Sequence, residues 1–320
     1  MDASGIPMIA LALCLAAAAA GAGLEPRPVP RMQAVPQPYQ QISFQRDGRE
    51  VARYHFGKDL DRPFIFPVIG PSGRPLTRMG HPHDPESHGH HNSVWVSHSD
   101  VNGTDFWSNN RGGRIVHQRI ERLDDGPDSA AVISHNNWVS TKEGKVLLKE
   151  RRTTAVHALP GDELLLVVDI ELSAEGADVT LGKTPFGFFA VRLAKTIGVH
   201  DGAGTVRNSE GGADEKGVFW KRAKWMDYSG AVADGVIEGI TLLDHPSNPN
   251  HPSIFHVRDD GWMGASFTQD GPRNLKLGEP LKLRYGLWVH DGLPDPKAIE
   301  ARWGAFARLP APEPPKPKGN

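Results

Sequence analysis

The sequence predicts an all-β protein, a large antiparallel β-sandwich or supersandwich that carries one short C-terminal helix. Between residues 39 and 308, short runs of β-branched and aromatic residues alternate with Gly, Pro, Asn and Asp. This alternation is typical of sandwiches and barrels, in which turns separate many short strands. Helical spacing stands out in only one place, near the end of the chain. The two observations together favour a sandwich with a single packed helix.

The predicted strands follow the runs in which apolar side chains dominate. They cover residues 41–46, 51–56, 64–69, 93–98, 114–123, 130–139, 146–159, 163–172, 187–193, 236–243, 253–258, 264–268 and 281–290. Residues 160–162, Pro-Gly-Asp, have the composition of a tight turn, so the two strands that flank them are expected to form a long hairpin.

The single predicted helix begins near residue 296. Asp295 can cap its first turn, where Pro296 is tolerated because the N–H that proline lacks has no partner within the helix there. Its apolar positions recur at helical spacing, at Ile299, Trp303 and Phe306. We expect this helix to pack against the sandwich.

The two ends of the chain differ in composition from the rest. Residues 1–22 contain an apolar run closed by small residues, which predicts a signal peptide and a location in the periplasm or outside the cell. Residues 23–38 and 309–320 are rich in proline, so we expect a linker and a tail around a single β-sandwich domain at 39–308. Cys14 is the only cysteine, and cleavage would leave a chain without thiols or disulfides. No membrane anchor is expected after cleavage.

The charge of the chain argues against nucleic acid as a partner. The formal net charge is -2 and the pI is about 6.7, and no block of Lys and Arg appears. Binding to a phosphate backbone relies on concentrated positive charge. A small molecule is therefore the expected partner.

Histidines concentrate in the segment His81–Trp107. Six of the fifteen histidines in the chain fall within residues 81–98, at His81, His83, His88, His90, His91 and His98. Side chains two apart in a strand share a face, so His88 and His90 could together hold one divalent metal ion, such as zinc, manganese, iron or nickel. A polar substrate wall with acid–base function, or a purely structural loop, would use the same residues.

The next residues, Asp100–Trp107, combine a turn signal with carboxylates and aromatic rings. Asp100 and Asn102 could orient histidine nitrogens or sugar hydroxyls. Phe106 and Trp107 are expected in the hydrophobic core, as in an ordinary β-turn.

Two later segments could supply further walls of a site. Residues 206–230 mix charge with aromatic faces, a chemistry suited to carbohydrate, although an exposed turn with solvated charges would look the same. Residues 243–261 contain a proline-stiffened loop, after which His256 and Arg258 alternate on a predicted strand. A stiff loop at the end of a strand commonly carries binding residues, and a packed connecting loop is the alternative.

Four segments of the chain resemble one bacterial family, which carries the label "methane oxygenase PmoA". They read HGHHNSVWVSHSDVNGTDFW, RNSEG, KRAKWMDYSG and LDHPSNPNHPSIFHVRD, and the resemblance covers about residues 40–305. The family pattern DHPHHRGLWF corresponds to residues 87–96. His88, His90 and His91 match it, whereas Ser87 and Asn92 replace its Asp and Arg. These departures argue against an anionic ligand at this wall.

The resemblance implies an exported, β-rich protein with a galactose-mutarotase-like supersandwich, of a kind often grouped with carbohydrate utilisation. A membrane-bound methane oxygenase subunit would need several apolar spans of ~20 residues. The sequence offers none after its predicted signal peptide, so we expect no oxygenase activity.

We therefore expect an exported carbohydrate-active enzyme, a hydrolase, lyase or epimerase acting on a small sugar or glycoside. Its acid–base residues are predicted to be His90, His91, Glu210 and Asp227. Its substrate-binding residues are predicted to be His98, Asp100, Asn102, Arg222, Trp225, Tyr228, Asp244, His245, His251 and Arg258. The alternative is a non-catalytic module that binds carbohydrate or metal.

Overall fold

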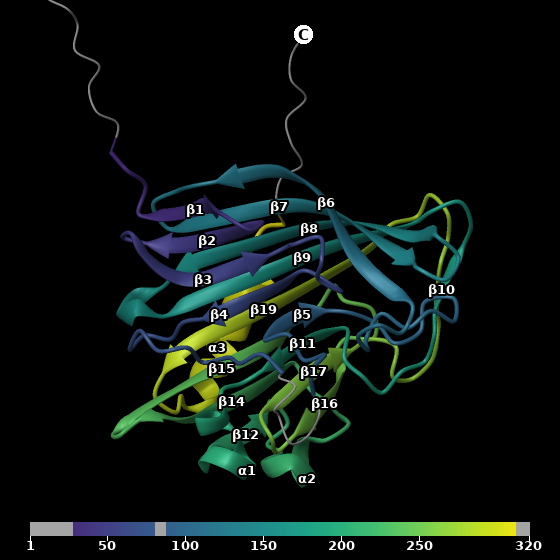
Figure 1. The fold of residues 1–320 in the computed structure, drawn as a ribbon. Helices are drawn as coiled ribbons and strands as arrows, with labels where there is room; N and C mark the ends of the chain where they lie inside the picture. The colour runs from purple at the N-terminus through teal and green to yellow at the C-terminus, as the bar shows by residue number, and fades with distance from the viewer. Residues whose placement is uncertain (1–27, 81–87, 312–320) are drawn as a thin grey trace, which may run out of the picture.

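Two large antiparallel sheets pack face to face in the structure, a computed structural model that describes residues 28–80 and 88–311 (Figure 1). The predicted signal peptide, His81 and His83 lie outside the described residues. Each pairing between neighbouring strands of the two sheets is antiparallel. The all-β sandwich predicted from the sequence is confirmed.

The first sheet has nine strands. In spatial order they are β1 (Met32–Gln37), β2 (Gln41–Arg46), β3 (Arg49–His55), β4 (Phe64–Val68), β5 (Val94–Val96), β11 (Phe189–Arg192), β17 (Trp262–Ser266), β16 (Ile254–Arg258) and β13 (Lys221–Arg222).

The second sheet has eight strands, and a small two-stranded sheet stands apart from both. The eight are β12 (Thr205–Asn208), β14 (Trp225–Ala233), β15 (Val236–Asp244), β19 (Leu281–Asp291), β9 (Leu164–Ala174), β8 (Lys145–Ala158), β7 (Ser129–Ser140) and β6 (Gly113–Asp124). The small sheet pairs β10 (Val179–Leu181) with β18 (Arg273–Leu275).

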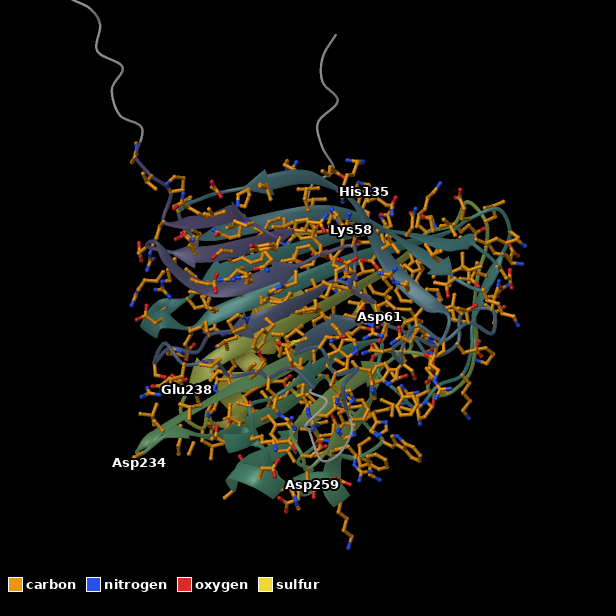
Figure 2. All side chains as sticks on the ribbon, viewed as in Figure 1. Lys58, Asp61, His135, Asp234, Glu238 and Asp259 are labelled. Atoms are coloured by element: carbon orange, nitrogen blue, oxygen red, sulfur yellow. The ribbon has the colours of Figure 1, made fainter. Side chains whose placement is uncertain are left out.

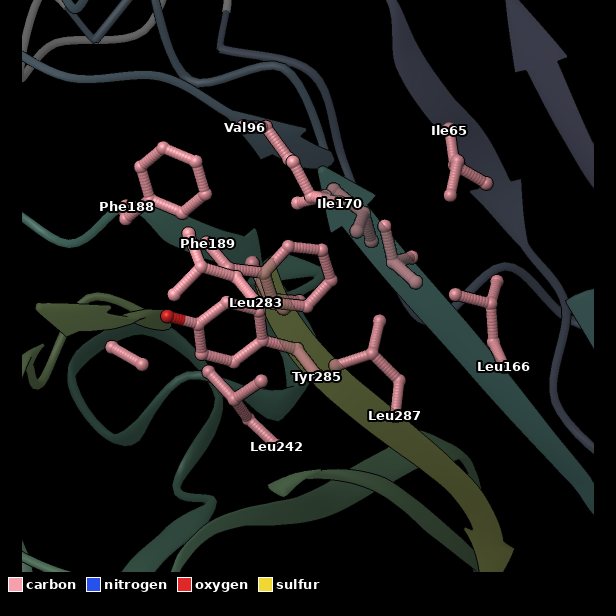
Figure 3. Packing of buried hydrophobic residues seen from close by; sticks show 14 of the residues in the cluster. Ile65, Val96, Leu166, Ile170, Phe188, Phe189, Leu242, Leu283, Tyr285 and Leu287 are labelled. Atoms are coloured by element: carbon pink, nitrogen blue, oxygen red, sulfur yellow. The ribbon is translucent and has the colours of Figure 1, made fainter. Parts of the chain in front are cut away.

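The main core fills the space between the two large sheets. Because successive side chains of a strand point to opposite faces, Met263 and Ala265 of β17 enter this core while Trp262 points to the outer face. In Figure 3 the ring of Tyr285 from β19 lies beside that of Phe189 from β11, and the two are stacked at 5.0 Å. Burying one large apolar side chain stabilises the fold by roughly 1.5–3 kcal/mol.

Short helical segments occupy the connections, and one longer helix covers an outer face. The short ones are η1 (Pro160–Asp162), η2 (Lys195–Ile197), α1 (Val199–Gly202) and α2 (Asp214–Val218). The longer one is α3 (Pro296–Ala307), and Asp295 caps it by accepting a hydrogen bond from the backbone N–H of Lys297 at 2.8 Å. Ile299 and Phe306 of α3 pack on Trp225 and Trp288 at the outer face of the eight-stranded sheet.

The predicted strands are all present, with shifts of a few residues at their ends, and the hairpin around residues 160–162 joins β8 to β9. The predicted linker is wrong for residues 32–37, which form β1 and pair with β2 from Met32–Arg46 to Gln37–Gln41. Pro36 is tolerated there because β1 is an edge strand, which needs backbone donors on only one side. Strands β10, β12, β13, β14 and β18 were not predicted.

The predicted tail also begins too early. Arg284 donates hydrogen bonds to the carbonyl oxygens of Leu309 and Pro310, at 3.0 and 3.1 Å, and so ties these residues to β19. Within the described part of the chain, no helix combines the length and apolarity that crossing a bilayer would require.

Candidate functional site

A pocket of about 640 Å³ opens on the outer face of the nine-stranded sheet, the face turned away from the main core. Figure 2 labels one of its residues, Asp259, at the end of the molecule where α1 and α2 lie. The pocket is lined by His88, His90, His91, Trp107, Ser108, Phe186, His200, His256, Arg258, Asp259, Asp260 and Trp262.

Strand register brings much of this lining together. His256 and Arg258 of β16 pair with Gly264 and Trp262 of β17, and Trp262 pairs in turn with Arg192 of β11. Directly paired residues of antiparallel strands point to the same face. The register therefore collects an imidazole, an indole and two guanidinium groups on the outer face of the sheet.

A close backbone contact fixes one wall. A Cβ atom at Gly187 would lie 2.6 and 2.7 Å from backbone carbons of Gly264, so only glycine fits at that crossing. The crossing places Phe186 over the sheet, where its ring stacks on Trp107 at 5.4 Å and on His256 at 5.6 Å. The wall is therefore aromatic and rigid.

The histidines of the loop before β5 form the opposite wall. His91 is 3% exposed and lies between the rings of His88, at 4.5 Å, and Trp95, at 5.1 Å. His90 meets His91 edge-on at 4.5 Å. This packing positions the three imidazoles against the aromatic cluster of the outer face.

A buried guanidinium holds this loop in place. Arg62 donates from Nη1 to the carbonyl oxygen of His90 and to Oδ1 of Asn92 and Asn109, at 3.2, 2.6 and 3.0 Å. From Nη2 it donates to the carbonyl oxygens of Phe106 and Trp107, at 3.1 and 2.8 Å. Burial lowers the pKa of Arg62 to about 10, which still leaves the group charged at neutral pH.

The hydrogen bond of His256 assigns its tautomer, and two charged groups lie near His88. His256 Nδ1 lies 3.0 Å from the carbonyl oxygen of Pro185, which can only accept, so Nδ1 carries the proton and Nε2 carries a lone pair. His88 Nδ1 lies 3.3 Å from Nη2 of Arg192 and 3.6 Å from Oδ2 of Asp260, so it faces both a donor and a carboxylate. Asp260 orients Arg192 through an ion pair of 2.7 Å.

Burial keeps three of the rings uncharged. It lowers the pKa of His90 to about 4, with the charge of Arg62 as the next cause. It also lowers the pKa of His256 to about 4, against the opposing effect of the hydrogen bond to Pro185. The pKa of His91 falls well below its ordinary value, through burial first and then through neighbouring His90 and Arg192. At neutral pH these rings accept or donate hydrogen bonds as neutral groups.

The geometry offers little to a metal ion. The rings of His88 and His90 are 6.2 Å apart between centroids. In residues 28–80 and 88–311, no group of three or more His, Cys, Asp or Glu side chains is arranged to hold a metal. A metal at His88 and His90 would therefore lack a third protein ligand from the described residues.

Of the residues predicted to form the site, four line the pocket: His88, His90, His91 and Arg258. The guanidinium of Arg258 lies 3.4 Å from Glu215 and covers the ring of Phe219. Residues 81–107, 206–230 and 243–261 were expected to line one cleft together. Among the described residues, only parts of the first and third of these segments line the pocket.

Asp227, predicted as a catalytic carboxylate, lies in the other sheet. It is fully buried and accepts hydrogen bonds from Thr241 at 2.7 Å, His290 at 3.0 Å, Arg207 at 3.0 Å and Ser229 at 3.1 Å. Burial alone would raise its pKa, but His290 and Arg207 outweigh that effect and lower it. All its acceptor capacity is used within the protein, so this arrangement is structural.

The remaining predicted residues of that segment also lie away from the pocket. Trp225 is buried under α3 and donates to Glu300, and the buried Tyr228 donates its hydroxyl proton to the carbonyl oxygen of Arg258. Glu210 is exposed and accepts from Ser209, and Arg222 binds Asp270 and two backbone carbonyl groups. Trp225 and Tyr228 face elsewhere because β14 belongs to the eight-stranded sheet, whereas the pocket lies on the nine-stranded one.

His98, Asp100 and Asn102 form hydrogen bonds within the protein around a turn. His98 is buried, lies 2.9 Å from Thr268 Oγ1 and accepts at Nδ1 from the backbone N–H of Asp100. Asp100 accepts from the N–H of Gly103, and Asn102 bonds both backbone groups of Thr180. None of the three lines the pocket.

Asp244, His245 and His251 stabilise the proline-rich loop. The buried Asp244 accepts from Asn248, from His251 Nδ1 and from the N–H of Ser253, each at 2.8 Å. His245 bonds Ser247 and the carbonyl oxygen of Ala307. These three residues likewise do not line the pocket.

The sequence did not single out several residues that do line it. Phe186, His200, Asp259, Asp260 and Trp262 reach the pocket through strand pairing and loop crossing, which no local pattern marks. Trp107 is buried as predicted, yet one part of it faces the pocket. His256 alternates with Arg258 on β16 as predicted, but no role had been assigned to it.

The fold and the pocket define an antiparallel β-sandwich protein with a histidine- and tryptophan-lined site on one outer face. The chain belongs to the family of unknown function DUF6807, whose profile matches residues 41–304. This match carries no methane oxygenase label, so the label given by the earlier resemblance has no support. No curated protein matches the chain.

Several solved structures match the chain at low sequence identity and with TM-scores below 0.5. The heparan sulfate lyase HepC from Pedobacter heparinus matches with a TM-score of 0.43 and 8% identity over 80% of this chain, which spans 36% of the lyase. A galactose 1-epimerase from Lactobacillus acidophilus NCFM matches with a TM-score of 0.35 and 9% identity, over 79% of this chain and 95% of the epimerase. A TPR-domain containing protein from Parabacteroides distasonis ATCC 8503 matches with a TM-score of 0.39 and 13% identity, over 88% and 51%.

Replacing Asp227 with Ala should destabilise the fold by roughly 3–5 kcal/mol, because it leaves the buried His290 and the half-buried Arg207 without their carboxylate. The free energy of unfolding in urea measures this. Glu175→Ala, which removes the exposed pair with Lys149, is the control and should cost far less. A loss for Asp227→Ala no larger than that of the control would contradict the structural role.

Stability should fall as the pH drops from about 6.5 towards 4. In this window the unfolded chain binds protons at histidines with an ordinary pKa of 6.5, whereas folded His90 and His256 have a pKa of about 4 and stay neutral. Stability from these groups is therefore complete above pH 6.5 and is lost below it. Urea unfolding near pH 7 and about pH 5 should show a smaller decrease for His256→Gln than for the natural chain. Equal decreases would contradict this assignment.

Proposed function

We propose that this protein is an exported carbohydrate-active enzyme that binds a sugar in the histidine pocket and moves a proton at it. The observation that carries the proposal is His256, with its proton on Nδ1 and a lone pair on Nε2, in one aromatic-lined pocket with His88, His90 and His91.

Sugar binding is supported by the mixture of flat apolar rings and neutral polar groups. Trp107, Phe186 and Trp262 offer ring faces and edges to the C–H side of a pyranose. The neutral imidazoles of His90 and His256 can bond hydroxyl groups without the desolvation cost of a charge. The volume of about 640 Å³ is ample for a monosaccharide.

Proton transfer is supported by the division of roles between the two histidines. His256 could accept a proton at Nε2 while its Nδ1–H remains bonded to Pro185. His88, whose Nδ1 lies 3.3 Å from Arg192 and 3.6 Å from Asp260, is the group that we assign to deliver a proton. Removal of a proton by one ring and delivery by the other would suit an epimerisation or elimination at a sugar carbon, or a hydrolysis.

The second candidate is a non-catalytic carbohydrate-binding module. It is favoured by one observation, the pKa of about 4 for His256, because a ring so hard to protonate is a weak base at neutral pH. Such a ring still accepts a hydrogen bond from a hydroxyl group. The two candidates therefore share the ligand and differ in turnover.

The test begins with isothermal titration calorimetry, in which D-glucose, D-galactose, D-mannose, D-xylose and D-glucuronate are each titrated into the full chain. Any sugar that binds is then incubated with the protein and followed by proton NMR for new or interconverted species. His256→Gln and His88→Gln should each lower turnover by about 10²-fold or more while changing the Kd by less than about tenfold. Glutamine keeps hydrogen-bonding capacity but cannot exchange a proton at neutral pH.

His157→Gln is the matched control, since His157 lies on β8 of the other sheet and does not line the pocket. It should bind and turn over the sugar as the natural chain does. Binding without any product would establish the module and overturn the enzyme. If no sugar binds, either free or as a glycoside, both the enzyme and the binding module would be overturned.

The single cysteine of the sequence, Cys14, allows a direct test of export. If residues 1–22 are removed, the mature chain lacks Cys14 and a maleimide reagent cannot label it. We expect labelled precursor inside the producing cell and unlabelled protein in the periplasm or medium, with an intact mass that corresponds to cleavage near residue 22. Labelled protein of full mass in the medium would contradict cleavage.

A further inference from the structure

Trp220 stands out on the surface beside the pocket. It lies between α2 and β13, is 48% exposed, and has a backbone φ of 55°. Its N–H donates to the carbonyl oxygen of Phe255, at 2.9 Å, which holds the backbone in this conformation. A tryptophan combines the largest apolar side chain with poor tolerance of positive φ, so both features need an explanation.

Tyr39 is another exposed aromatic residue with a positive φ, and its position in a hairpin turn explains that φ. It is 89% exposed and has a φ of 62°, but it sits with Gln40, φ 57°, in the tight turn between β1 and β2. Two successive residues with positive φ are what such a hairpin turn requires. Trp220 follows Phe219 (φ −61°, ψ 123°) at the third position of a tight turn, which requires a positive φ and usually takes glycine. Turn geometry therefore accounts for the φ of Trp220 but not for an exposed indole at this position.

The ring of Trp220 packs on a neighbouring ring and contacts a residue that lines the pocket. It stacks on Phe219 at 4.6 Å, and the guanidinium of Arg258 covers Phe219 at 5.5 Å. Both aromatic rings meet His256 edge-on, Phe219 at 4.9 Å and Trp220 at 6.0 Å. Phe219 and Trp220 therefore form an aromatic shelf that shares His256 with the pocket.

We propose that this shelf is a second sugar-binding subsite, so that the ligand of the pocket is a glycoside of at least two units. The inference rests on the proposed function. One unit would occupy the histidine pocket, and the next would lie against the exposed indole of Trp220, across His256. An exposed, braced indole is suited to the apolar face of a pyranose, and the ligand would cover the surface that now contacts water.

The charges around the pocket select a neutral glycoside. Asp259 and Asp260 are the carboxylates among the described lining residues, and Asp260 is paired with Arg192. Arg258, the guanidinium of that lining, lies 3.4 Å from Glu215. A sulfated or uronate unit would meet these carboxylates without a surplus of positive charge to compensate.

The experiment compares one-unit and two-unit ligands in the full chain. Each free sugar of the panel above is titrated beside neutral disaccharides that contain it, such as cellobiose, lactose and mannobiose. Trp220→Ala should weaken the disaccharide by about tenfold or more and change the monosaccharide by less than about twofold. Tyr39→Ala, which removes an even more exposed ring from a turn outside the pocket lining, should change neither.

A second variant guards against simple misfolding. Trp220→Gly removes the indole but relaxes the positive φ, so its urea midpoint should equal or exceed that of the natural chain while disaccharide affinity is lost. Equal disaccharide affinity in the natural chain and both variants would overturn the subsite and leave the proposed function intact. Failure of every monosaccharide and disaccharide to bind would instead overturn the proposed function itself.

Sedimentation of the same variants tests the other occupant of such a surface, a second copy of this chain. We expect the same sedimentation coefficient for the natural chain and Trp220→Ala. A dimer that Trp220→Ala converts to monomer, with unchanged disaccharide affinity, would make the shelf an interface between copies and overturn the subsite.

Discussion

The arrangement of the candidate site depends on the buried guanidinium of Arg62. Its five hydrogen bonds join the histidine loop, through His90 and Asn92, to the loop at residues 106–109. Without those acceptors a buried cation would be costly, and without the cation the carbonyl groups would lack donors. Asn92 therefore helps to hold the histidine loop in place, since its side-chain oxygen accepts the shortest of these bonds.

Because side chains alternate along each strand, the inner and outer faces of the two sheets carry different groups of residues. The inner faces of both sheets pack the main core, the outer face of the nine-stranded sheet carries the pocket, and the outer face of the other sheet carries α3 and the Asp227 network. Polar clusters on the two outer faces look alike in the sequence. They differ in that the Asp227 cluster saturates its own hydrogen bonds while the histidine cluster surrounds an open volume.

The sequence was sufficient for the strands with a clear apolar pattern and for the capped helix, and three of the histidines that it singled out, His88, His90 and His91, line the pocket. It was insufficient for β1, because Pro36 resembles a linker residue, and for β14, because Trp225 to Gly230 are buried on both faces and show no alternation. It could not assign Trp262, Asp260 or Phe186 to the site, since their positions come from the pairing of β17 with β11 and β16, from the turn between β16 and β17, and from the crossing of Gly187 over Gly264. Such long-range register leaves no local trace.

The contact between Gly187 and Gly264 bears on how a ligand would enter. The segment it belongs to is also fastened by the N–H of Phe188 to Ala265, at 2.7 Å, and by Ser266 to the carbonyl oxygen of Thr184, at 3.2 Å. Phe186 is thus part of a wall already in place before any ligand arrives. Binding would not have to order this segment, so its affinity would not be reduced by that entropy and its association would not wait for that wall to form.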